Sequence, residues 1–277
     1  MSVTDAHAAS PVQADTAPLL REDRDGVTTL TMNRPQSRNS LSEAMLLALG
    51  RELDAIKSDT SVRVVILAAN GPAFSAGHDL KEMTAHRSDP DRGRAYFKKI
   101  MDGCSAVMQT IVLLPQPVIA CVQGVATAAG CQLVATCDLA VASSAARFAT
   151  PGVNIGLFCS TPMVALSRNL SRKHAMEMLL NGEMLSADDA VRMGLINKSV
   201  APGTEHDAAI TMARAIAAKS SHTVKIGKEA FYRQIEMPLA EAYRYCAEVM
   251  VENMLARDAE EGIGAFLEKR APRWEDQ

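Results

Sequence analysis

The apolar run from Val62 to Ala68, interrupted only by Arg63, is the feature that most constrains the fold of this chain. A strand with one solvated face alternates apolar and polar residues, whereas a nearly unbroken apolar run is typical of a strand covered on both faces. The segments PVIACVQ (117–123) and DLAVAS (138–143) have the same character, and VTTLTMN (27–33) alternates like a strand. Because strands covered on both faces occur in parallel sheets flanked by helices, we predict an α/β protein.

Helix signals lie between and after these strands. Ser40 and Glu43 are spaced as a capping box, and leucine or methionine recurs at every fourth position beyond them, which predicts a helix. Residues 84–94 are polar and predict a loop or a short mobile helix. Further helices are expected from about residue 128, over 161–180 with an end at Gly182, and over a short segment that Ser186 and Asp189 cap and Gly194 ends. From Glu205 onward the pattern is almost entirely helical.

Charge and hydropathy exclude several classes of protein. The chain has 29 Lys and Arg against 32 Asp and Glu, a formal net charge of −3, so it has no global positive field to hold nucleic acid. Its longest apolar stretch, residues 111–122, contains Pro115, Gln116 and Pro117, and is too short and too broken to span a membrane. We therefore expect a soluble protein with neither a nucleic-acid nor a membrane partner.

The six cysteines lie mostly in apolar runs, with no CxxC pair and no Cys/His spacing that suits zinc. This pattern predicts reduced thiols, a cytoplasmic protein and no metal site. No cofactor is predicted either. Residues 1–20 contain Asp5 and Asp15 but no Lys or Arg, unlike a signal or transit peptide, so we expect a loose tail.

Two junctions rich in small residues are the candidate site: FSAGHDLKEM (74–83) and VQGVATAAGCQL (122–133). Each follows a predicted strand, where α/β folds place ligands, and neither contains a dinucleotide or P-loop motif. Backbone N–H groups at the start of a helix have no partner in the helix and sit at its positive end. Two such turns can hold a carbonyl oxygen as it gains negative charge. Close packing of helix on sheet is the alternative explanation for the small residues.

These two junctions, with RFATPGVNIGLF (147–158), AMEMLLNGEMLSADDAVRMGLINKSV (175–200) and the final AFLEKRAPRW, resemble the crotonase (enoyl-CoA hydratase/isomerase) superfamily in the right order. The resemblance covers roughly residues 23–273. It implies a spiral of ββα units with a C-terminal helical region, homotrimers or hexamers, and an acyl-CoA thioester as substrate. It divides the chain into a tail (1–20), a spiral core (21–200) and a helical trimerisation region (201–277).

The resemblance also assigns residues. The N–H groups of His78 and Ala129 would form an oxyanion hole that stabilises a thioester enolate, the chemistry that the family shares. The family's C-terminal residues approach the CoA nucleotide, in some members from a neighbouring subunit. The positions that match substrate-binding and CoA-binding residues are Ser37, Arg38, Ala76, His78, Asp79, Leu80, Lys81, Ala129, Phe266 and Lys269.

Two departures from the family pattern are more informative than the matches. Where hydratases have their two acid–base glutamates this chain has Gln132 and Gly152, so it resembles enoyl-CoA hydratase domain-containing members that lack both. Glutamine cannot exchange a proton near neutral pH and glycine has no side chain, so standard two-glutamate hydration is not expected. Cys159 can act in their place or be an inert buried thiol, and an anion or water can occupy the space of the carboxylate that residue 152 lacks, with Gln132 as its partner. Ser160 is expected to cap a helix, and Asp138 a strand junction.

Three functions remain in competition. The first is an enzyme of fatty-acid and acyl-CoA metabolism, a lyase resembling enoyl-CoA hydratase. The second is a non-catalytic acyl-CoA binding or scaffold protein. The third is an RNA-binding relative, suggested only by the basic cluster of Arg87, Arg92, Arg94, Lys98 and Lys99, among which Asp89 and Asp91 are interleaved. A serine peptidase of similar fold is not supported, since no Ser/His pair lies in a motif.

Overall fold

The computed structural model describes residues 17–277, and residues 1–16 of the predicted tail lie outside them. The tail was predicted to extend to residue 20, but Leu19 already begins strand β1 (Leu19–Arg24), which pairs antiparallel with β2 (Val27–Met32). Asp25 and Gly26 join the two strands, with φ of 52° and 77°. Two positive φ values are typical of a type I′ hairpin turn, for which Asp-Gly is a favoured sequence.

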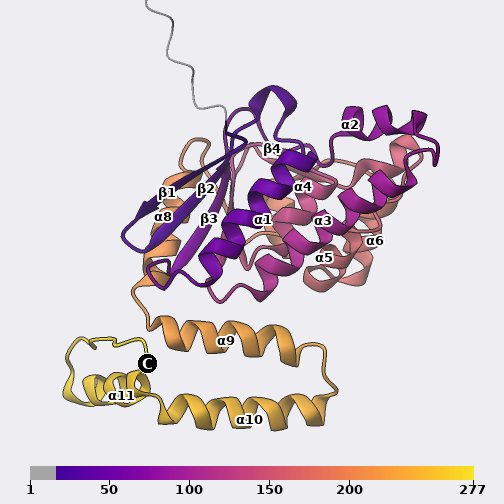
Figure 1. Ribbon diagram of the computed structural model, residues 1–277. Helices are drawn as coiled ribbons and strands as arrows, with labels where there is room; N and C mark the ends of the chain where they lie inside the picture. The colour runs from indigo at the N-terminus through magenta and orange to yellow at the C-terminus, as the bar shows by residue number, and fades with distance from the viewer. Residues whose placement is uncertain (1–16) are drawn as a thin grey trace, which may run out of the picture.

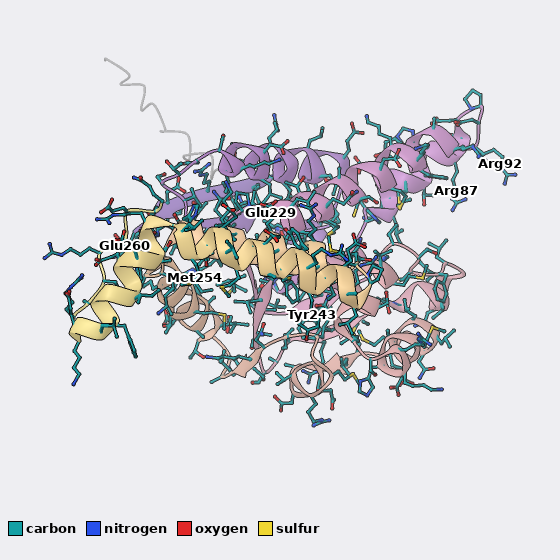
Figure 2. The ribbon with its side chains drawn as sticks, turned by 90° about the horizontal axis from the view of Figure 1, so that it is seen from below. Arg87, Arg92, Glu229, Tyr243, Met254 and Glu260 are labelled. Atoms are coloured by element: carbon teal, nitrogen blue, oxygen red, sulfur yellow. The ribbon has the colours of Figure 1, made fainter. Side chains whose placement is uncertain are left out.

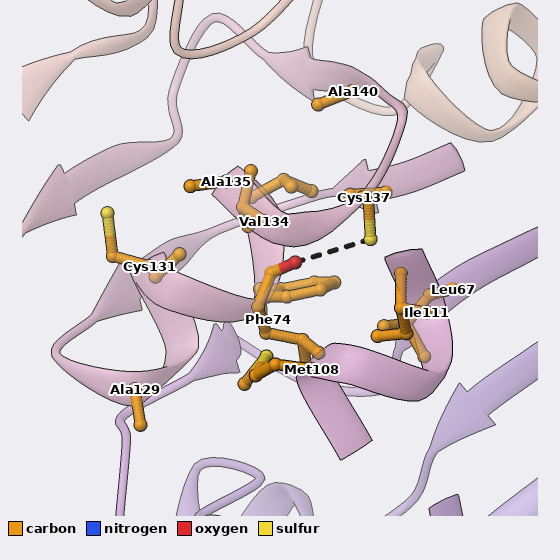
Figure 3. Close-up of a cluster of buried hydrophobic side chains, with 14 of the residues drawn as sticks. Leu67, Phe74, Met108, Ile111, Ala129, Cys131, Val134, Ala135, Cys137 and Ala140 are labelled. Atoms are coloured by element: carbon orange, nitrogen blue, oxygen red, sulfur yellow. Dashed lines mark hydrogen bonds between the residues drawn. The ribbon is translucent and has the colours of Figure 1, made fainter. Parts of the chain in front are cut away.

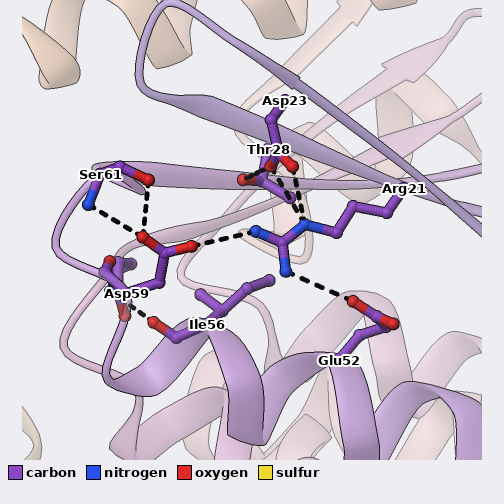
Figure 4. Close-up of polar contacts among 8 residues, drawn as sticks. Arg21, Asp23, Thr28, Glu52, Ile56, Asp59 and Ser61 are labelled. Atoms are coloured by element: carbon purple, nitrogen blue, oxygen red, sulfur yellow. Dashed lines mark hydrogen bonds and ion pairs between the residues drawn. The ribbon is translucent and has the colours of Figure 1, made fainter.

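A polar network fastens this hairpin to helix α1 (Glu43–Lys57) and to the loop that follows it. Figure 4 shows the guanidinium of Arg21 between three carboxylates. Its Nε lies 2.9 Å from Asp23, its Nη1 3.4 Å from Glu52 and its Nη2 3.2 Å from Asp59. The hairpin is therefore a fixed edge of the molecule.

The larger sheet has six strands in the order β1-β2-β3-β5-β7-β10 and is parallel apart from β1. Every strand predicted from an apolar run is present, which confirms the α/β class. The strands beyond the hairpin are β3 (Val64–Ala69), β5 (Val118–Val122), β7 (Leu139–Ser143) and β10 (Lys198–Val200).

A second sheet of four short strands, in the order β4-β6-β8-β9, lies beside it. Three long strands in turn are each followed by a short strand of this second sheet and then by a helical segment, which gives the spiral of ββα units. Strands of two or three residues are too short to show a periodicity, so the sequence pattern did not predict these four. They are β4 (Ala73–Ser75), β6 (Val125–Thr127), β8 (Arg147–Ala149) and β9 (Leu185–Ser186).

Helices cover both faces of the larger sheet (Figure 1). On β3, Val65 and Leu67 face the main core with helices α1 and α3 (Arg94–Leu113), while Val64 and Ile66 pack with α8 (Glu205–Ala217) on the other face. Burial on alternate sides explains why the strand is apolar throughout. Among residues 17–277 no helix is long and apolar enough to span a membrane.

Helix α4 (Ala129–Thr136), which follows the second small-residue junction, lies deep in this core. Figure 3 shows Val134 of α4 in one apolar cluster with Phe74 of β4 and with Met108 and Ile111 of α3. All eight residues of α4 are buried. Burial on every side holds the start of this helix in a fixed position relative to β4.

Several helix boundaries differ from those predicted. Ser42, not Ser40, caps α1, because the hydroxyl of Ser40 instead donates to Asp79. The helix predicted over 161–180 is two helices that break at Leu170 and Ser171, and its end at Gly182 is confirmed. Ser160 is not a cap, since its hydroxyl donates to the carbonyl of Phe158. The two helices are α5 (Pro162–Asn169) and α6 (Arg172–Asn181).

The short helix capped by Ser186 and ended by Gly194 is confirmed as α7 (Ala187–Met193). Residues 84–94, predicted as a loop or a short mobile helix, contain little regular structure. Helix α2 (Leu80–Ala85) leads into the 3-10 helix η2 (His86–Ser88), and α3 begins at Arg94. The remaining 3-10 turns are η1 (Pro35–Ser37) and η3 (Pro151–Ile155).

Helices α9 (Ser221–Gln234), α10 (Leu239–Leu255) and α11 (Arg257–Glu268) extend beneath the sheets (Figure 1). A buried cluster attaches α9 to the core: Lys228 Nζ lies 2.7 Å from Asp138 and donates to the carbonyls of Ile111 and Gln116. Asp138 also accepts from the amide of Val118, so it does more than cap a junction. This ammonium uses all three of its donors.

Candidate active site

The candidate site is built on two backbone segments that run side by side, residues 37–41 and 76–79. The amide of Ala76 donates to the carbonyl of Arg38 at 3.0 Å, and that of Leu41 to the carbonyl of Gly77 at 2.8 Å. Leu41 and His78 form a parallel bridge. In such a bridge Leu41 bonds to the neighbours of His78, so the N–H of His78 points to the opposite side.

The second junction meets the first at Gly77. A Cβ on Gly77 would lie 2.9 Å from the Cβ of Ala128 and 3.2 Å from the amide nitrogen of Ala129, and its φ of +87° also favours glycine. At the next residue of α4, a Cβ on Gly130 would lie 2.3 Å from the carbonyl oxygen of Ser75. Close packing therefore explains both glycines, and the same packing places the start of α4 beside the amide of His78.

Ala128 has an unusual backbone conformation, with φ of 50° and ψ of −120°. A non-glycine residue in such a region costs about 1–3 kcal/mol and persists only where its surroundings impose it. Here the amide of Ala128 donates to the carbonyl of Ala149 at 2.9 Å, and its carbonyl accepts from Gln132 at 3.0 Å. Within residues 17–277, the amides of His78 and Ala129 donate no hydrogen bond. The two junctions thus present two free N–H donors close together.

The side chain of His78 is neutral near pH 7. Burial lowers the pKa of its imidazole, against the opposing effect of the Leu41 carbonyl. Nδ1 lies 3.4 Å from that carbonyl, which can only accept, so Nδ1 carries the proton. Nε2 is buried and has no partner in the described part of the chain. The ring is therefore an acceptor and not a charged group.

Asp79 begins helix α2 and has a structural role. Its carboxylate accepts from the amides of Lys81 and Glu82 at 3.0 and 3.1 Å, and from the hydroxyl of Ser40 at 2.9 Å. Burial raises the pKa of Asp79, but these hydrogen bonds outweigh it and lower the pKa overall. Leu80 and Lys81 follow as the first residues of α2, and both are exposed.

Gln132 lies one turn into α4. It is only 4% exposed, and its Oε1 has no hydrogen-bond partner among the described residues. Side chains on a helix lean toward its N-terminus, so Gln132 covers the turn at which Ala129 presents its amide. A buried amide in this position can orient a bound group but cannot remove a proton from it.

Gly152 lies in η3 with no open space beside it. A Cβ built there would lie 2.9 Å from the Sγ of Cys159 and 2.8 Å from the carbonyl oxygen of Leu157. Sulfur and backbone therefore crowd the position of a Cβ at residue 152. Burial raises the pKa of Cys159, opposed by the amide of Gly152, so the thiol is protonated near neutral pH.

The predicted CoA-binding residues fall into two groups. Ser37 and Arg38 lie at η1 next to Ala76, where the hydroxyl of Ser37 donates to the carbonyl of Arg34 and Arg38 has a left-handed φ of 53°. Phe266, 80% exposed, and Lys269 lie on and just after α11. Figure 1 shows α11 below α9, well away from β4 and α2. Within one chain these last two residues do not join the site.

Sequence reasoning missed two features that shape the site. One is the contact of Glu82, whose carboxylate accepts from the amide of Glu43 at the start of α1. The other is the positive φ of Ala128, which nothing in the sequence predicts apart from the small residues around it. In the described part of the chain, no group of His, Cys, Asp or Glu side chains is arranged to hold a metal ion.

The basic cluster that suggested RNA binding is partly neutralised. Lys98 pairs with Asp102 and Lys99 with Glu43. The guanidinium of Arg87 lies over the ring of Phe97, 5.6 Å from its centroid. Figure 2 shows Arg87 and Arg92 at one end of the molecule.

Comparison with known proteins agrees with this architecture. The family model described as enoyl-CoA hydratase/isomerase matches residues 22–277. Rat enoyl-CoA hydratase domain-containing protein 3, mitochondrial, is 45% identical over 96% of this chain and 88% of its own length. A solved structure of enoyl-CoA hydratase from Mycobacterium smegmatis is 55% identical, with a TM-score of 0.89 over 93% of this chain and 98% of that one. The crystal structure of human enoyl-CoA hydratase domain-containing protein 3 is 46% identical, with a TM-score of 0.88 over 93% and 100%.

These relatives correct one prediction and establish another. The rat protein and its human counterpart are named mitochondrial, which contradicts the predicted cytoplasmic location. Six free cysteines indicate a reducing environment, but they do not tell one reducing compartment from another. The fold, the matched residues 22–277 and the identities show the family directly. The chain belongs to the enoyl-CoA hydratase/isomerase family, the crotonase superfamily.

Proposed function

We propose that this protein binds an acyl-CoA thioester and stabilises its enolate between the backbone N–H groups of His78 and Ala129. The observation that carries the proposal is the meeting of the two junctions at Gly77, which leaves these two donors free and adjacent. A thioester oxygen gains negative charge when the α-carbon loses a proton, and fixed N–H donors stabilise that charge without rearranging.

The family supports a lyase-type enzyme resembling enoyl-CoA hydratase. We do not expect standard two-glutamate hydration, because Gln132 and Gly152 stand at the positions that we assign to the glutamates. Cys159 does not replace them: its thiol is protonated and packs against Gly152. The protein therefore relies on the two backbone donors to stabilise the enolate. The base that removes the α-proton would be a water molecule, a group of the substrate itself, or a side chain other than those of residues 132, 152 and 159.

We further propose that the protein assembles as a homotrimer or hexamer, and that Phe266 and Lys269 approach the CoA nucleotide of a neighbouring subunit. Large apolar side chains are exposed along α10 and α11, including Leu239 (75%), Tyr243 (72%) and Leu255 (77%). Figure 2 shows Tyr243 and Met254 on α10. An apolar surface of this kind marks an interface. Ser37, Arg38 and Ala76 would contact CoA from the same chain as the hole.

The second candidate is a non-catalytic acyl-CoA binding protein, and one observation favours it. Of the two assumed acid–base positions, Gln132 carries an amide and Gly152 has no side chain, and the thiol of Cys159 beside Gly152 is protonated, so none of the three residues supplies a base near pH 7.

One experiment separates the two. Purified protein is incubated with crotonyl-CoA and butyryl-CoA in D₂O, and hydration and α-proton exchange are followed by mass. Exchange without fast hydration supports enolate stabilisation. Tight binding with neither reaction would favour the binding protein, and no binding of any thioester would overturn both.

A further inference from the structure

Asn39 lies in the segment 37–41 and is fully buried. Its side-chain amide bonds three backbone groups: Nδ2 donates to the carbonyls of Asn70 and Ala73 at 2.9 and 2.8 Å, and Oδ1 accepts from the amide of Arg34 at 2.8 Å. Carbonyls only accept and N–H groups only donate, so these partners fix the orientation of the amide. One side chain therefore ties the turn that begins at Arg34 to the stretch of chain that enters β4.

The residues on either side of Asn39 hold the stretch of chain that leaves β4. The carbonyl of Arg38 accepts from the amide of Ala76 at 3.0 Å, and the hydroxyl of Ser40 donates at 2.9 Å to the carboxylate that caps α2. His78 lies between these two contacts, with its N–H on the opposite side. The position of this donor therefore depends on the segment that Asn39 holds.

The backbone at Asn39 needs such support. Arg38 and Asn39 both have left-handed conformations, with φ of 53° and 50°. Asparagine tolerates this region better than most residues, but two consecutive residues in it persist only where their surroundings impose them. Residues 38–42 lie between η1 and α1 and belong to neither helix. The bonds of the buried amide are therefore a main restraint on the course of this segment.

The two proposed donors are held by different parts of the molecule. Ala129 begins α4, which is buried on every side, whereas His78 follows a strand of only three residues. Two donors stabilise one oxygen only when both lie at hydrogen-bond distance from it, and a misplacement of about 1 Å can lower a rate about 10²-fold. The donor at His78 is thus the one whose position needs to be secured.

We propose that Asn39 is a positioning residue, whose buried amide sets the place of the His78 N–H relative to that of Ala129 and so the strength with which the pair polarises a thioester carbonyl. This inference rests on the proposed function, since it takes the two amides as the donors to that oxygen. The competing explanation is that Asn39 only stabilises the fold. In that case its loss would lower stability but leave the bound carbonyl unchanged in the folded protein.

Asn39→Asp tests the proposal with little change of shape. Aspartate keeps the acceptor for Arg34, tolerates a left-handed φ, and loses at least one of the two donated bonds in either protonation state. Butyryl-CoA labelled with carbon-13 at its thioester carbonyl is bound to the full-length protein. Infrared difference spectroscopy then records the carbonyl stretch, whose frequency falls when donors bond the oxygen.

We expect the wild-type protein to lower this frequency relative to the free thioester. Asn39→Asp should lose about half of that shift, since one of the two donors is misplaced. The rate of α-proton exchange in D₂O at saturating thioester should fall about 10- to 100-fold in the same variant.

Gln116→Glu is the matched control, because Gln116 is also a buried amide that joins distant segments. It is 7% exposed, and its Nε2 donates to the carbonyls of Ile56 and Asp59 at 2.9 and 3.3 Å. It precedes β5, at the end of that strand opposite the second junction. This variant should lose stability in urea unfolding while it keeps the wild-type carbonyl frequency and exchange rate.

Wild-type frequency and exchange in a folded Asn39→Asp protein would overturn the inference and leave the proposed function intact. Equal losses in Gln116→Glu and Asn39→Asp would also overturn it, since any lost buried amide would then disturb the site. A bound thioester whose carbonyl does not shift in the wild-type protein would instead overturn the proposed function. Circular dichroism checks folding. Should Asn39→Asp fail to fold, Asn39→Gly is judged by the same outcomes, because glycine adopts the left-handed φ without strain and removes all three side-chain bonds.

Discussion

The sulfur of Cys159 lies against Gly152, only 2.9 Å from the point where a Cβ on residue 152 would stand. The carbonyl oxygen of Leu157 blocks the same space from another direction at 2.8 Å. A side chain at residue 152 would therefore meet close contacts at its first carbon. Placing a glutamate there requires the 157–159 segment to move, so restoring an acid–base pair is more than a change of two residues.

Gly152→Ala is expected to destabilise the fold by about 1–3 kcal/mol, the usual cost of overpacking a buried site. Adding Cys159→Ala should recover part of this loss, since it removes the sulfur but leaves the Leu157 carbonyl. Urea unfolding measures both. Gly50→Ala is the control: no atom lies within 4 Å of its Cβ position in α1, and alanine there should stabilise by up to about 1 kcal/mol. A Gly152→Ala variant as stable as wild type would contradict the close contact.

Ala129→Pro tests the backbone donor directly. Ala129 is the first residue of α4, where proline is tolerated, so the change removes one N–H without breaking a hydrogen bond inside the helix. Loss of one oxyanion donor typically lowers a rate about 10²- to 10³-fold, and we expect that loss in α-proton exchange measured in D₂O.

Arg172→Pro is the matched control, since it places proline at the first position of α6, away from the candidate site. Circular dichroism checks that both variants fold. Equal exchange rates in folded Ala129→Pro and wild type would remove Ala129 from the site.

Thiol reactivity should separate Cys246 from the other cysteines. Burial raises the pKa of Cys104, Cys121 and Cys131 to about 12, and it also raises the pKa of Cys159. Because the thiolate is the reactive form, we expect a disulfide reagent at pH 8 to modify Cys246, which is half-buried, before the rest. Cys246→Ser should remove the fast phase. Rapid labelling of Cys159, mapped by mass spectrometry, would instead indicate a nucleophile.

Lys228→Met should destabilise the protein by about 3–5 kcal/mol, because it leaves the buried carboxylate of Asp138 without its cation. The two side chains are only 7% and 15% exposed. Chemical unfolding gives the value. Lys225→Met, on an exposed part of the same helix, is expected to stay within about 0.5 kcal/mol of wild type. Similar small effects for both would show that the buried cluster does not anchor α9.

Asp79→Ala should cost about 0.5–2 kcal/mol near pH 7 by removing the cap of α2. The folded pKa of Asp79 is lowered below its ordinary 3.8, so its stabilisation is present above about pH 3.8 and is lost as the pH falls through the folded pKa. The difference between wild type and variant should therefore shrink toward acid. Stability curves at pH 7, 4 and 2.5 measure it, and a difference that is constant over this range would show that the carboxylate is not responsible.

Local patterns determined most of the fold. The apolar runs predicted β3, β5 and β7, since burial on both faces acts on every residue of a strand, and Gly182 and Gly194 marked helix ends because each has a left-handed φ. Short strands such as β4 were not predicted, because three residues cannot show the alternation of a strand. The start of α1 was wrongly predicted at Ser40, because the hydroxyl of Ser40 donates to Asp79, a residue far along the chain.

The sequence by itself determined an α/β chain with two small-residue junctions, and it showed glutamine and glycine at residues 132 and 152. Only the tertiary structure decided that the junctions meet at Gly77, that Ala128 is strained and that Cys159 fills the space beside Gly152. It also showed that α11, which contains Phe266, lies away from β4 and α2 of its own chain (Figure 1). The physical reason is that residue types and spacings express local preferences, whereas contacts between atoms of distant segments exist only once the sheets and helices have packed together.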